Sequence, residues 1–475
     1  NGVSRRAEIQ RHLMPVLLGW FAEGVDADAG LLGFRLVSES LGTTSWYLRM
    51  LRDSPAAAER LCQILSSSRY ITDLLEDAPT SITWLDKVAD LQPLSAGALK
   101  AEITSLLSRH EDSADAMRAV RYLRRREILR IAMGDALNLL SVQQVCTGLA
   151  TVDECTIGAA LALAEREEVK AGERNEETAP QKNDAPQSDS QEATGENPEE
   201  GQRNPLLTEI TVIAMGRLGG AENGFGSDAD VMFVHRPVEG ADEKEAQAQA
   251  NRIVNRLMQL IKQPVRPAIR AERPLEVDAD LRPEGKQGAM VRSLDSYRAY
   301  YERWAETWEF QALLRARPIA GSEELGRAFI ELIDPYRYPR EFTAEQAQQV
   351  RRMKARVEHE RMPHGADRTR QLKLGRGGLS DVEWLVQLIQ LQHAHEVQGL
   401  RTTSTLEALN AAVEANLVAA EDAEVLRDAW LLATKIRGGN VLRGVRQSDL
   451  LPTLRDALEA VARWSGYSPG SARQL

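Results

Sequence analysis

The clearest chemical signal in the sequence is a pair of aspartates two residues apart. Asp228 and Asp230 begin an apolar run, and residues 230–234 are predicted to form a strand. Side chains at i and i+2 of a strand point to the same face, so these two carboxylates lie together. Two carboxylates this close resist joint ionisation unless a cation neutralises them. Because hard oxygen ligands suit Mg²⁺ or Mn²⁺, the spacing predicts a divalent metal site.

A glycine-rich turn precedes this pair. Residues 208–215 are predicted to form a strand, and the sequence GRLGG follows at 216–220. Gly219 and Gly220 let the backbone approach a ligand closely and aim N–H groups at an anion, and Ser227 adds a hydroxyl donor. The spacing matches neither a Walker phosphate loop nor a dinucleotide fingerprint. A bare D-x-D is more often a solvated turn, but its combination with this strand and glycine pair favours a metal and phosphate site.

A third carboxylate is predicted nearby. Residues 275–281 alternate as a strand, which places Asp278 and Asp280 on one face. If this strand lies beside the first aspartate pair, one of the two acids faces the same metal. Arg282 follows in a loop with Gly285 and Gly288, where it is predicted to bring a positive charge to a triphosphate.

Helical patterns surround these predicted strands. Apolar residues recur at helical spacing through much of 5–168, and residues 243–262 and 294–315 are each predicted to form a helix. Residues 342–475 are predicted to be helical around a second glycine turn at 374–379. Two interpretations of this turn are equally weighted: Lys373 reaches a phosphate, or the turn is only a helix start with glycines for packing. The predicted fold class is α+β and mostly helical, with a small α/β domain between two helical regions. The predicted segments are 1–169, 170–203, 204–335 and 336–475.

The stretch 170–203 differs from the rest of the chain. It contains nine acidic and four basic residues and no large apolar residue. It has no apolar surface whose burial would offset its ordering entropy, so it is predicted to be a disordered acidic insertion.

Composition excludes several classes of protein. The chain has 475 residues, 43% of them hydrophobic, and a net charge of -11, which argues against a non-specific nucleic-acid binder. Cys62, Cys146 and Cys155 are far apart and odd in number, so a disulfide framework is not expected and the cytoplasm is the expected compartment. No run of 18 apolar residues is present, so no membrane-spanning segment is predicted.

Two other groups of charges are predicted to be structural. The arginines of 118–130 are predicted to form a solvated or salt-bridged helix face, with contact to an acidic partner or to the central domain as the minority alternative. Glu309 is predicted to belong to a buried ion pair.

The strand, glycine pair, D-x-D and third carboxylate resemble the DNA polymerase β-type nucleotidyltransferase superfamily. Four longer segments narrow this resemblance, and together they are similar to the glutamine synthetase adenylyltransferases. These segments are residues 216–233, 277–285, 308–321 and 372–387. The chain departs from that family at Ala229, Val231 and Met232, where larger aliphatic residues are usual. It also departs at Asp280, where arginine is frequent, and in its acidic insertion.

The resemblance implies that Asp228, Asp230 and Asp278 hold two Mg²⁺ or Mn²⁺ ions and carry the catalysis. It implies nucleotide contacts from Gly219, Gly220, Ser227, Arg282 and Lys373. The implied reaction transfers AMP from ATP to a tyrosine of glutamine synthetase. The PII signal protein is the implied regulator, and the other half of a two-part enzyme is an implied partner. No nucleic-acid or membrane partner is expected.

Alternatives remain open at this point. Gly226 and Ser227 before the first aspartate resemble the AMP-attaching, C-terminal half of the family enzyme, but the AMP-removing half would use the same carboxylates. A PII uridylyltransferase shares the second glycine turn, although no His-Asp dipeptide of its phosphohydrolase domain occurs here. A catalytically inactive binding module is a further alternative.

Overall fold

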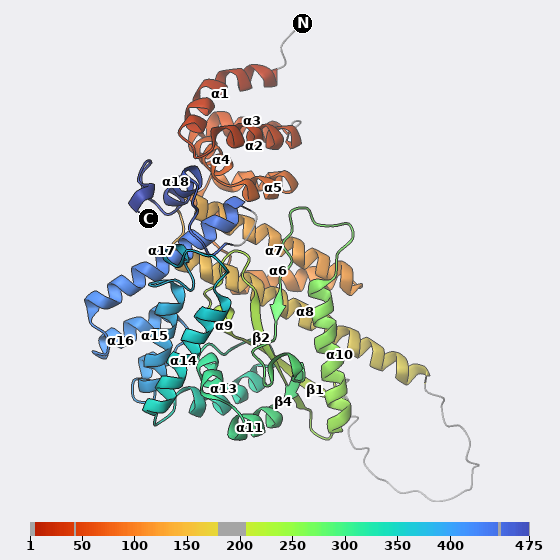
Figure 1. Ribbon diagram of the computed structural model, residues 1–475. Coiled ribbons are helices and arrows are strands. Elements are labelled where there is room, and N and C mark those ends of the chain that lie inside the picture. The colour runs from red at the N-terminus through yellow and green to blue at the C-terminus, as the bar shows by residue number, and fades with distance from the viewer. Residues whose placement is uncertain (1–4, 42–43, 179–205, 445–447, 475) are drawn as a thin grey trace, which may run out of the picture.

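The computed structural model describes residues 5–41, 44–178, 206–444 and 448–474. It is mostly helical, with one small mixed sheet, which confirms the predicted fold class. Figure 1 shows the N-terminal helices at the top, the sheet below them in green and the C-terminal helices in blue on the left.

The N-terminal helical region leads from a stack of short helices into two long ones. Helix α7 begins at a capped end, where the Asp112 carboxylate accepts the backbone N–H groups of Ala114 and Asp115. Helix α8 is the longest and packs against α6, α7, α10 and β5. The elements are α1 Arg5–Ala22, α2 Ala27–Ser40, α3 Ser45–Asp53, α4 Pro55–Ser67, α5 Arg69–Asp77, the 3₁₀ helices η1 Pro79–Leu85 and η2 Val88–Leu91, α6 Ala96–Arg109, α7 Ser113–Ala136 and α8 Val142–Thr178.

Helix α8 corrects one expectation, the disorder predicted from residue 170 onward. It continues to Thr178, so residues 170–178 are helical rather than disordered, because residues of good helix propensity extend a helix that is already nucleated. The rest of the predicted insertion, 179–203, lies outside the described residues. The part of α8 at Val142–Glu173 is long and apolar enough to cross a membrane by composition, but 72% of its most apolar window is buried inside the protein, as in a core helix.

The central region contains a five-stranded sheet within the described chain. Strand β1 pairs antiparallel with β2 and β5, and β2 pairs parallel with β3 and β4. The strands are β1 Thr208–Ala214, β2 Ala229–Pro237, β3 Val277–Asp278, β4 Val291–Ser293 and β5 Arg317–Gly321. The helices between and after them are α9 Gly216–Gly219, α10 Glu243–Lys262, η3 Gly285–Gln287, α11 Leu294–Arg303, α12 Thr307–Leu313 and α13 Glu323–Arg337.

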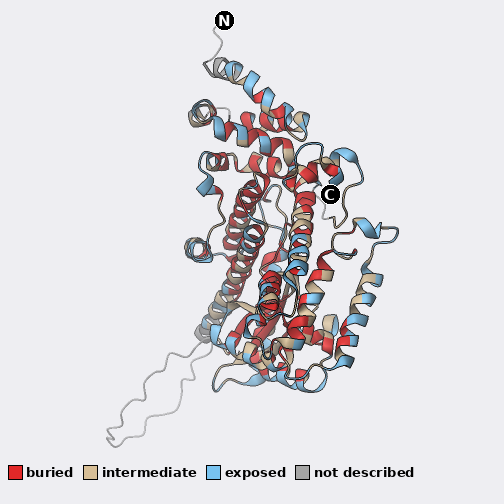
Figure 2. Ribbon diagram, turned by 90° about the vertical axis from the view of Figure 1, so that its left-hand side faces the viewer, coloured by how far each residue is buried: buried red, intermediate tan, exposed pale blue. Residues whose placement is uncertain are grey.

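The two faces of the sheet enter different cores. Val212, Val231 and Phe233 join the large core that also contains the N-terminal helices, whereas Ile213 and Met232 pack with α11 and α13. Figure 2 shows this buried interior running continuously from the long helices into the sheet. The N-terminal helical region and the sheet therefore share one core.

The C-terminal region forms the third part of the molecule. Its helices build further cores, and α17 returns to the N-terminal region, where Lys435 forms an ion pair with Asp135. The elements are α14 Ala344–Arg361, η4 Arg368–Arg370, α15 Leu379–His393, η5 Gln398–Leu400, α16 Thr405–Glu414, α17 Ala420–Gly444, α18 Arg455–Trp464 and η6 Ala472–Gln474.

Several predicted elements differ in detail. The predicted strand 275–281 shortens to Val277–Asp278, and strands β4 and β5 were not predicted. The predicted helix 294–315 is two helices, because the chain turns at residues 304–306 and Glu306 caps a new helix. The helix predicted at 243–262 is confirmed.

Candidate active site

The predicted aspartates meet where β2 and β3 run side by side. Asp230 and Asp278 are register partners in this parallel pair, and the Ala229 N–H donates to the Glu276 carbonyl at 2.8 Å. Asp230 lies on the β2 face that carries Met232, opposite the face of Val231 and Phe233. The predicted adjacency of the third strand and the first aspartate pair is therefore present.

Burial and mutual repulsion make these carboxylates hard to ionise. Burial, followed by the charges of Asp278 and Asp228, raises the pKa of Asp230 to about 6. Burial, followed by the charges of Glu276 and Asp278, also raises the pKa of Asp228. The Lys373 charge opposes both increases. A site that concentrates negative charge in this way favours a bound cation.

The structure separates the two candidates for the third carboxylate. Asp280 turns toward the loop that follows, where its carboxylate lies 3.2 Å from the Lys286 Nζ and 3.7 Å from an Arg282 nitrogen. Asp278 keeps the register position beside Asp230, and its Oδ1 accepts the Asp280 N–H at 2.7 Å. Asp278 is thus the better placed of the two acids.

The oxygen ligands of Asp228, Asp230 and Asp278 suit a divalent metal, although the three carboxylates do not form a ready-made binding cluster. Among the residues that the structure describes, no three carboxylate, histidine or cysteine side chains are arranged closely enough to hold a metal ion as they stand. The like charges of the aspartates disfavour a closer approach of the three carboxylates unless a cation neutralises them. Asp228, Asp230 and Asp278 are the residues that would hold Mg²⁺ or Mn²⁺ through oxygen ligands.

Gly216, which was not singled out from the sequence, is the glycine closest to the carboxylates. Its φ is +52°, and a Cβ at this position would lie 2.2 Å from the Asp230 Oδ2. Any larger residue would collide with the carboxylate and strain the backbone. Position 216 therefore requires glycine for the carboxylate site itself.

Gly219 and Gly220 have a different role from the predicted one. Their N–H groups donate to the carbonyls of Met215 and Gly216, at 2.8 and 3.3 Å, so neither amide is free to bind phosphate. A Cβ on Gly219 would lie 1.8 Å from the Arg315 carbonyl oxygen. These glycines allow the turn to pack against the chain before β5.

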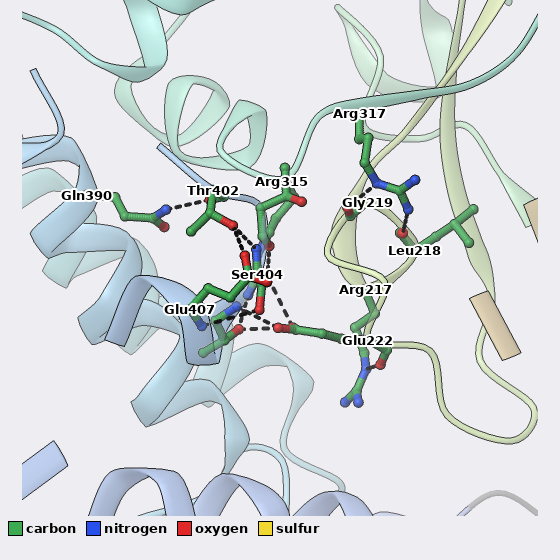
Figure 3. A network of polar contacts seen from close by, with 12 residues as sticks. Arg217, Leu218, Gly219, Glu222, Arg315, Arg317, Gln390, Thr402, Ser404 and Glu407 are labelled. Atoms are coloured by element: carbon green, nitrogen blue, oxygen red, sulfur yellow. Dashed lines mark hydrogen bonds and ion pairs between the residues drawn. The ribbon is translucent and has the colours of Figure 1, made fainter. Parts of the chain in front are cut away.

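A buried polar network fixes this turn (Figure 3). Glu222 pairs with Arg315 at 3.1 Å and accepts the Thr405 N–H at 2.6 Å and its hydroxyl at 2.9 Å. Arg317 donates to the Leu218 and Gly219 carbonyls, each at 3.0 Å. The glycine turn is thus tied both to β5 and to the start of α16 in the C-terminal region.

Lys373 acts on both aspartates, and Arg217 and Arg437 lie around Lys373. Lys373 is largely buried, has no ion-pair partner among the described residues, and has a pKa lowered by burial and then by the Arg437 charge. Burial, followed by the Arg217 charge, lowers the pKa of Arg437, whose Nε donates to Asp449 at 2.6 Å. The Arg217 Nη2 is buried without a hydrogen-bond partner. This cation cluster, Arg217, Lys373 and Arg437, has the chemistry to bind a polyphosphate.

Only Lys373 of this cluster was predicted from the sequence. Arg217 stands inside the glycine motif, in which the spacing of the glycines is the signal that the sequence carries. Arg437 lies on α17, far away in sequence and with no motif around it. Folding alone brings it to the site.

Two other residues that were predicted to contact the nucleotide, Arg282 and Ser227, form hydrogen bonds within the protein. All three guanidinium nitrogens of Arg282 donate to backbone carbonyls, those of Ala279, Lys286 and Gly288, at 2.8 to 3.0 Å. This geometry favours support of the loop after β3 over the predicted phosphate contact. The Ser227 hydroxyl accepts the Gly224 N–H at 3.0 Å and keeps its own proton for a ligand.

The arginines of α7 form ion pairs, as predicted, among them Arg124 with Asp153 and Arg126 with Glu102, and they also contact the central region, which was the minority alternative. Arg121, Arg124 and Arg125 donate to the carbonyls of Gln263, Arg273 and Arg270, at 2.5 to 2.7 Å. The segment between α10 and β3 contains little regular structure, so its carbonyls need side-chain donors.

The predicted ion pair of Glu309 is wrong, because the Glu309 carboxylate accepts the Glu306 N–H and the Tyr300 hydroxyl instead.

Comparison with known proteins agrees with this architecture. The family model described as glutamate-ammonia ligase adenylyltransferase matches residues 58–188 and 183–332, and a model for PII-uridylyltransferase matches residues 351–475. A Streptomyces avermitilis protein is 47% identical over 99% of this chain, and a Leifsonia xyli protein is 44% identical over 100% of it. Both are named bifunctional glutamine synthetase adenylyltransferase/adenylyl-removing enzyme. The chain spans 45% of the first relative and 43% of the second. With a family model that matches more than half of its length, this chain belongs to the glutamate-ammonia ligase adenylyltransferase family.

Proposed function

We propose that this chain transfers AMP from ATP to a tyrosine of glutamine synthetase and releases pyrophosphate. The observation that carries the proposal is the position of Lys373, one member of the cation cluster, beside Asp228 and Asp230, with Asp278 in register with Asp230. The carboxylates can hold metal ions against the α-phosphate, while the cations can meet the charge of the two outer phosphates. The names of the two relatives supply the acceptor protein.

In the proposed reaction, the tyrosine oxygen attacks the α-phosphorus and forms a new P–O bond. The bond from that phosphorus to the oxygen bridging to the β-phosphate breaks, and its electron pair leaves with pyrophosphate. The phenolic proton passes to water or to a carboxylate of the trio. A phenol, with a pKa of about 10, is easier to deprotonate than an aliphatic alcohol. When bound, Mg²⁺ or Mn²⁺ would supply charge neutralisation and lower the pKa of the attacking hydroxyl.

The residues of the chain bind and orient the reactants. Asp228, Asp230 and Asp278 would hold the metal ions, two in number. Lys373 and Arg217 neutralise the departing pyrophosphate from fixed positions, which reduces reorganisation during the reaction, and Arg437, held by Asp449, adds its remaining guanidinium nitrogens. Ser227, next to Asp228, donates its hydroxyl proton to an oxygen of the α-phosphate, at which the acceptor and the leaving group meet.

The direction of the reaction depends on what surrounds the carboxylates, since removal of AMP by orthophosphate displaces at the same phosphorus. Gly226 and Ser227 resemble the attaching half of the family, and the three clustered cations suit a triphosphate better than orthophosphate. We therefore favour attachment. The PII signal protein as regulator, the other half of the full-length enzyme as partner and a cytoplasmic location belong to the same proposal. Neither a nucleic acid nor a membrane has a place in it.

A labelling experiment tests this function. The purified chain is incubated with α-labelled ATP, Mg²⁺ and unmodified glutamine synthetase, and in parallel AMP-modified glutamine synthetase is incubated with orthophosphate. We expect label on the acceptor tyrosine and pyrophosphate in the first reaction, and no ADP in the second. Formation of ADP without any labelling from ATP would assign the chain to AMP removal.

A further inference from the structure

A cavity of about 470 Å³ opens beside Asp228 on the side of the N-terminal helices. Its walls come from α5, α7 and α8, from the loop before β2 and from the segment before β3. In Figure 1, α7 and α8 lie above β2, whereas α14, α15 and α17 lie to its left. The cavity is lined by Asp228 and Glu276, but by neither Lys373 nor the two arginines of the cation cluster.

Ion pairs and hydrogen bonds hold the walls of this cavity in place. Arg124 pairs with Asp153 at 2.8 Å and donates to the Arg273 carbonyl at 2.7 Å. The second Asp153 oxygen accepts from the Asn223 amide at 2.9 Å. Because the Arg124 and Asp153 side chains are only 11% and 8% exposed, the cavity is preformed rather than created by a ligand.

The charges of the lining exclude a polyphosphate. Four acidic residues contribute to it, and only two basic ones, Arg124 and Arg273. Arg124 is paired with Asp153, and Glu272 is paired with Arg121, so these charges offset each other. The charges that remain are those of Asp228, Glu276 and Arg273, and the Arg273 guanidinium lies over the Tyr70 ring, 4.1 Å from its centroid. The acidic lining residues are Asp153, Asp228, Glu272 and Glu276. A net negative cavity repels the nucleotide phosphates and leaves them to the cation cluster.

The remaining lining suits an aromatic side chain with a polar tip. Tyr70, Phe225, Ile128 and Leu149 supply aromatic and apolar surface. A ring resting on this surface would direct its hydroxyl toward Asp228, the first of the three carboxylates. Aromatic rings bury large areas while their hydroxyl groups keep hydrogen bonds.

Phosphoryl transfer places the attacking and leaving oxygens roughly in line, on opposite sides of the phosphorus. The cation cluster provides the leaving-group side. We propose that the cavity between the N-terminal helices and β3 receives the acceptor tyrosine ring, with Asp228 shared between the two sides. This inference rests on the proposed function and extends it, because it makes α5, α7 and α8 part of the acceptor site.

Filling the cavity tests the proposal. Ile128 lines it from α7 and is only partly buried, so Ile128→Trp adds bulk inside the cavity, and Pro274→Trp adds bulk at its exposed rim. Val425→Trp is the matched control, because Val425 is 69% exposed on α17 and does not line the cavity. For each variant, KM and kcat for glutamine synthetase are measured by AMP incorporation, the Kd for ATP with Mg²⁺ by titration, and the Tm by calorimetry.

We expect Ile128→Trp and Pro274→Trp to raise KM for glutamine synthetase about tenfold or more, with the Kd for ATP changed less than about twofold. Val425→Trp should match the wild type. A parallel loss of ATP affinity in both cavity variants would show that the nucleoside occupies the cavity and would overturn the proposal. Unchanged KM in a folded Ile128→Trp variant would overturn it as well. Failure of the proposed function is distinguishable, since the wild-type chain would then not label glutamine synthetase.

Discussion

Asp230 of β2 and Asp278 of β3 are direct register partners in a parallel pair of strands, although 47 residues separate them in the chain. The pairing places carboxylates on neighbouring strands in a partly buried position. The raised pKa values of Asp228 and Asp230 are the electrostatic consequence. Binding of a divalent cation would remove that cost, which connects the register of two short strands to the chemistry of the site.

We predict that Asp228→Asn and Asp230→Asn each abolish AMP transfer and leave the fold intact. Each substitution removes an anionic ligand without changing the size of the side chain. Asp280→Asn is the matched control, because Asp280 faces Lys286 and Arg282 instead of the other carboxylates. Activity is measured with saturating Mg²⁺, and folding by circular dichroism. Near-native turnover of either active-site variant would contradict the metal-binding assignment.

The stability of the metal-free Asp230→Asn variant should depend on pH in a defined direction. The pKa of Asp230 rises from 3.8 to about 6, so the folded protein holds its proton more tightly than the unfolded chain does. Asp230 therefore lowers the free energy of unfolding progressively as the pH rises from about 4 to 6. Above pH 6 this destabilisation is constant and is at most about 3 kcal/mol. The variant should match the wild type near pH 4 and have the higher Tm at pH 7, both measured in EDTA. A lower Tm at pH 7 would contradict the electrostatic account.

Lys373→Met should weaken ATP binding about tenfold or more, because it removes a charged contact to phosphate worth about 1.5–3 kcal/mol. Lys286→Met is the control, since Lys286 is 83% exposed on the loop after β3. Isothermal titration with ATP and Mg²⁺ measures both affinities. Equal affinities for the two variants would remove Lys373 from the proposed phosphate site.

Gly216→Ala should lose activity through displacement of the Asp230 carboxylate, which lies 2.2 Å from the position of the added methyl group. Gly240→Ala carries a similar backbone strain, with φ at +81°, but its methyl group would meet no atom within 4 Å. Both variants should lose a little stability, and only Gly216→Ala should lose transfer activity. Comparable activities, measured by AMP incorporation, would show that the close contact does not matter.

Glu222→Ala should be strongly destabilising, by about 3–5 kcal/mol, because it leaves Arg315 buried without its counter-ion. The two side chains are only 6% and 8% exposed. Glu324→Ala is the control, because it breaks the ion pair between Arg236 and Glu324, whose side chain is 70% exposed. It should change the free energy of unfolding by less than about 1 kcal/mol. Chemical denaturation measures both. A small effect of Glu222→Ala would show that the network in Figure 3 does not hold the glycine turn.

The sequence by itself determined the predominance of helix, the approximate positions of β1, β2 and α10, and the spacing of Asp228 and Asp230. The helices and strands follow from the local periodicity of apolar residues, and the aspartate pair follows from a spacing of two residues. Neither feature requires a contact between distant segments of the chain. The resemblance of four segments to one family also required no structure. The choice of Asp278 over Asp280 came from that resemblance, since alternation places both acids on one face.

Only the tertiary structure decided which groups surround the carboxylates. Arg437 reaches the site from α17, and Tyr70 and Arg124 reach the cavity from the N-terminal helices, all through packing between distant segments. The roles of Gly219 and Arg282 changed for the same reason. Whether an amide or a guanidinium is free to bind a ligand depends on which carbonyls lie within hydrogen-bond distance, and those carbonyls are brought there only by folding.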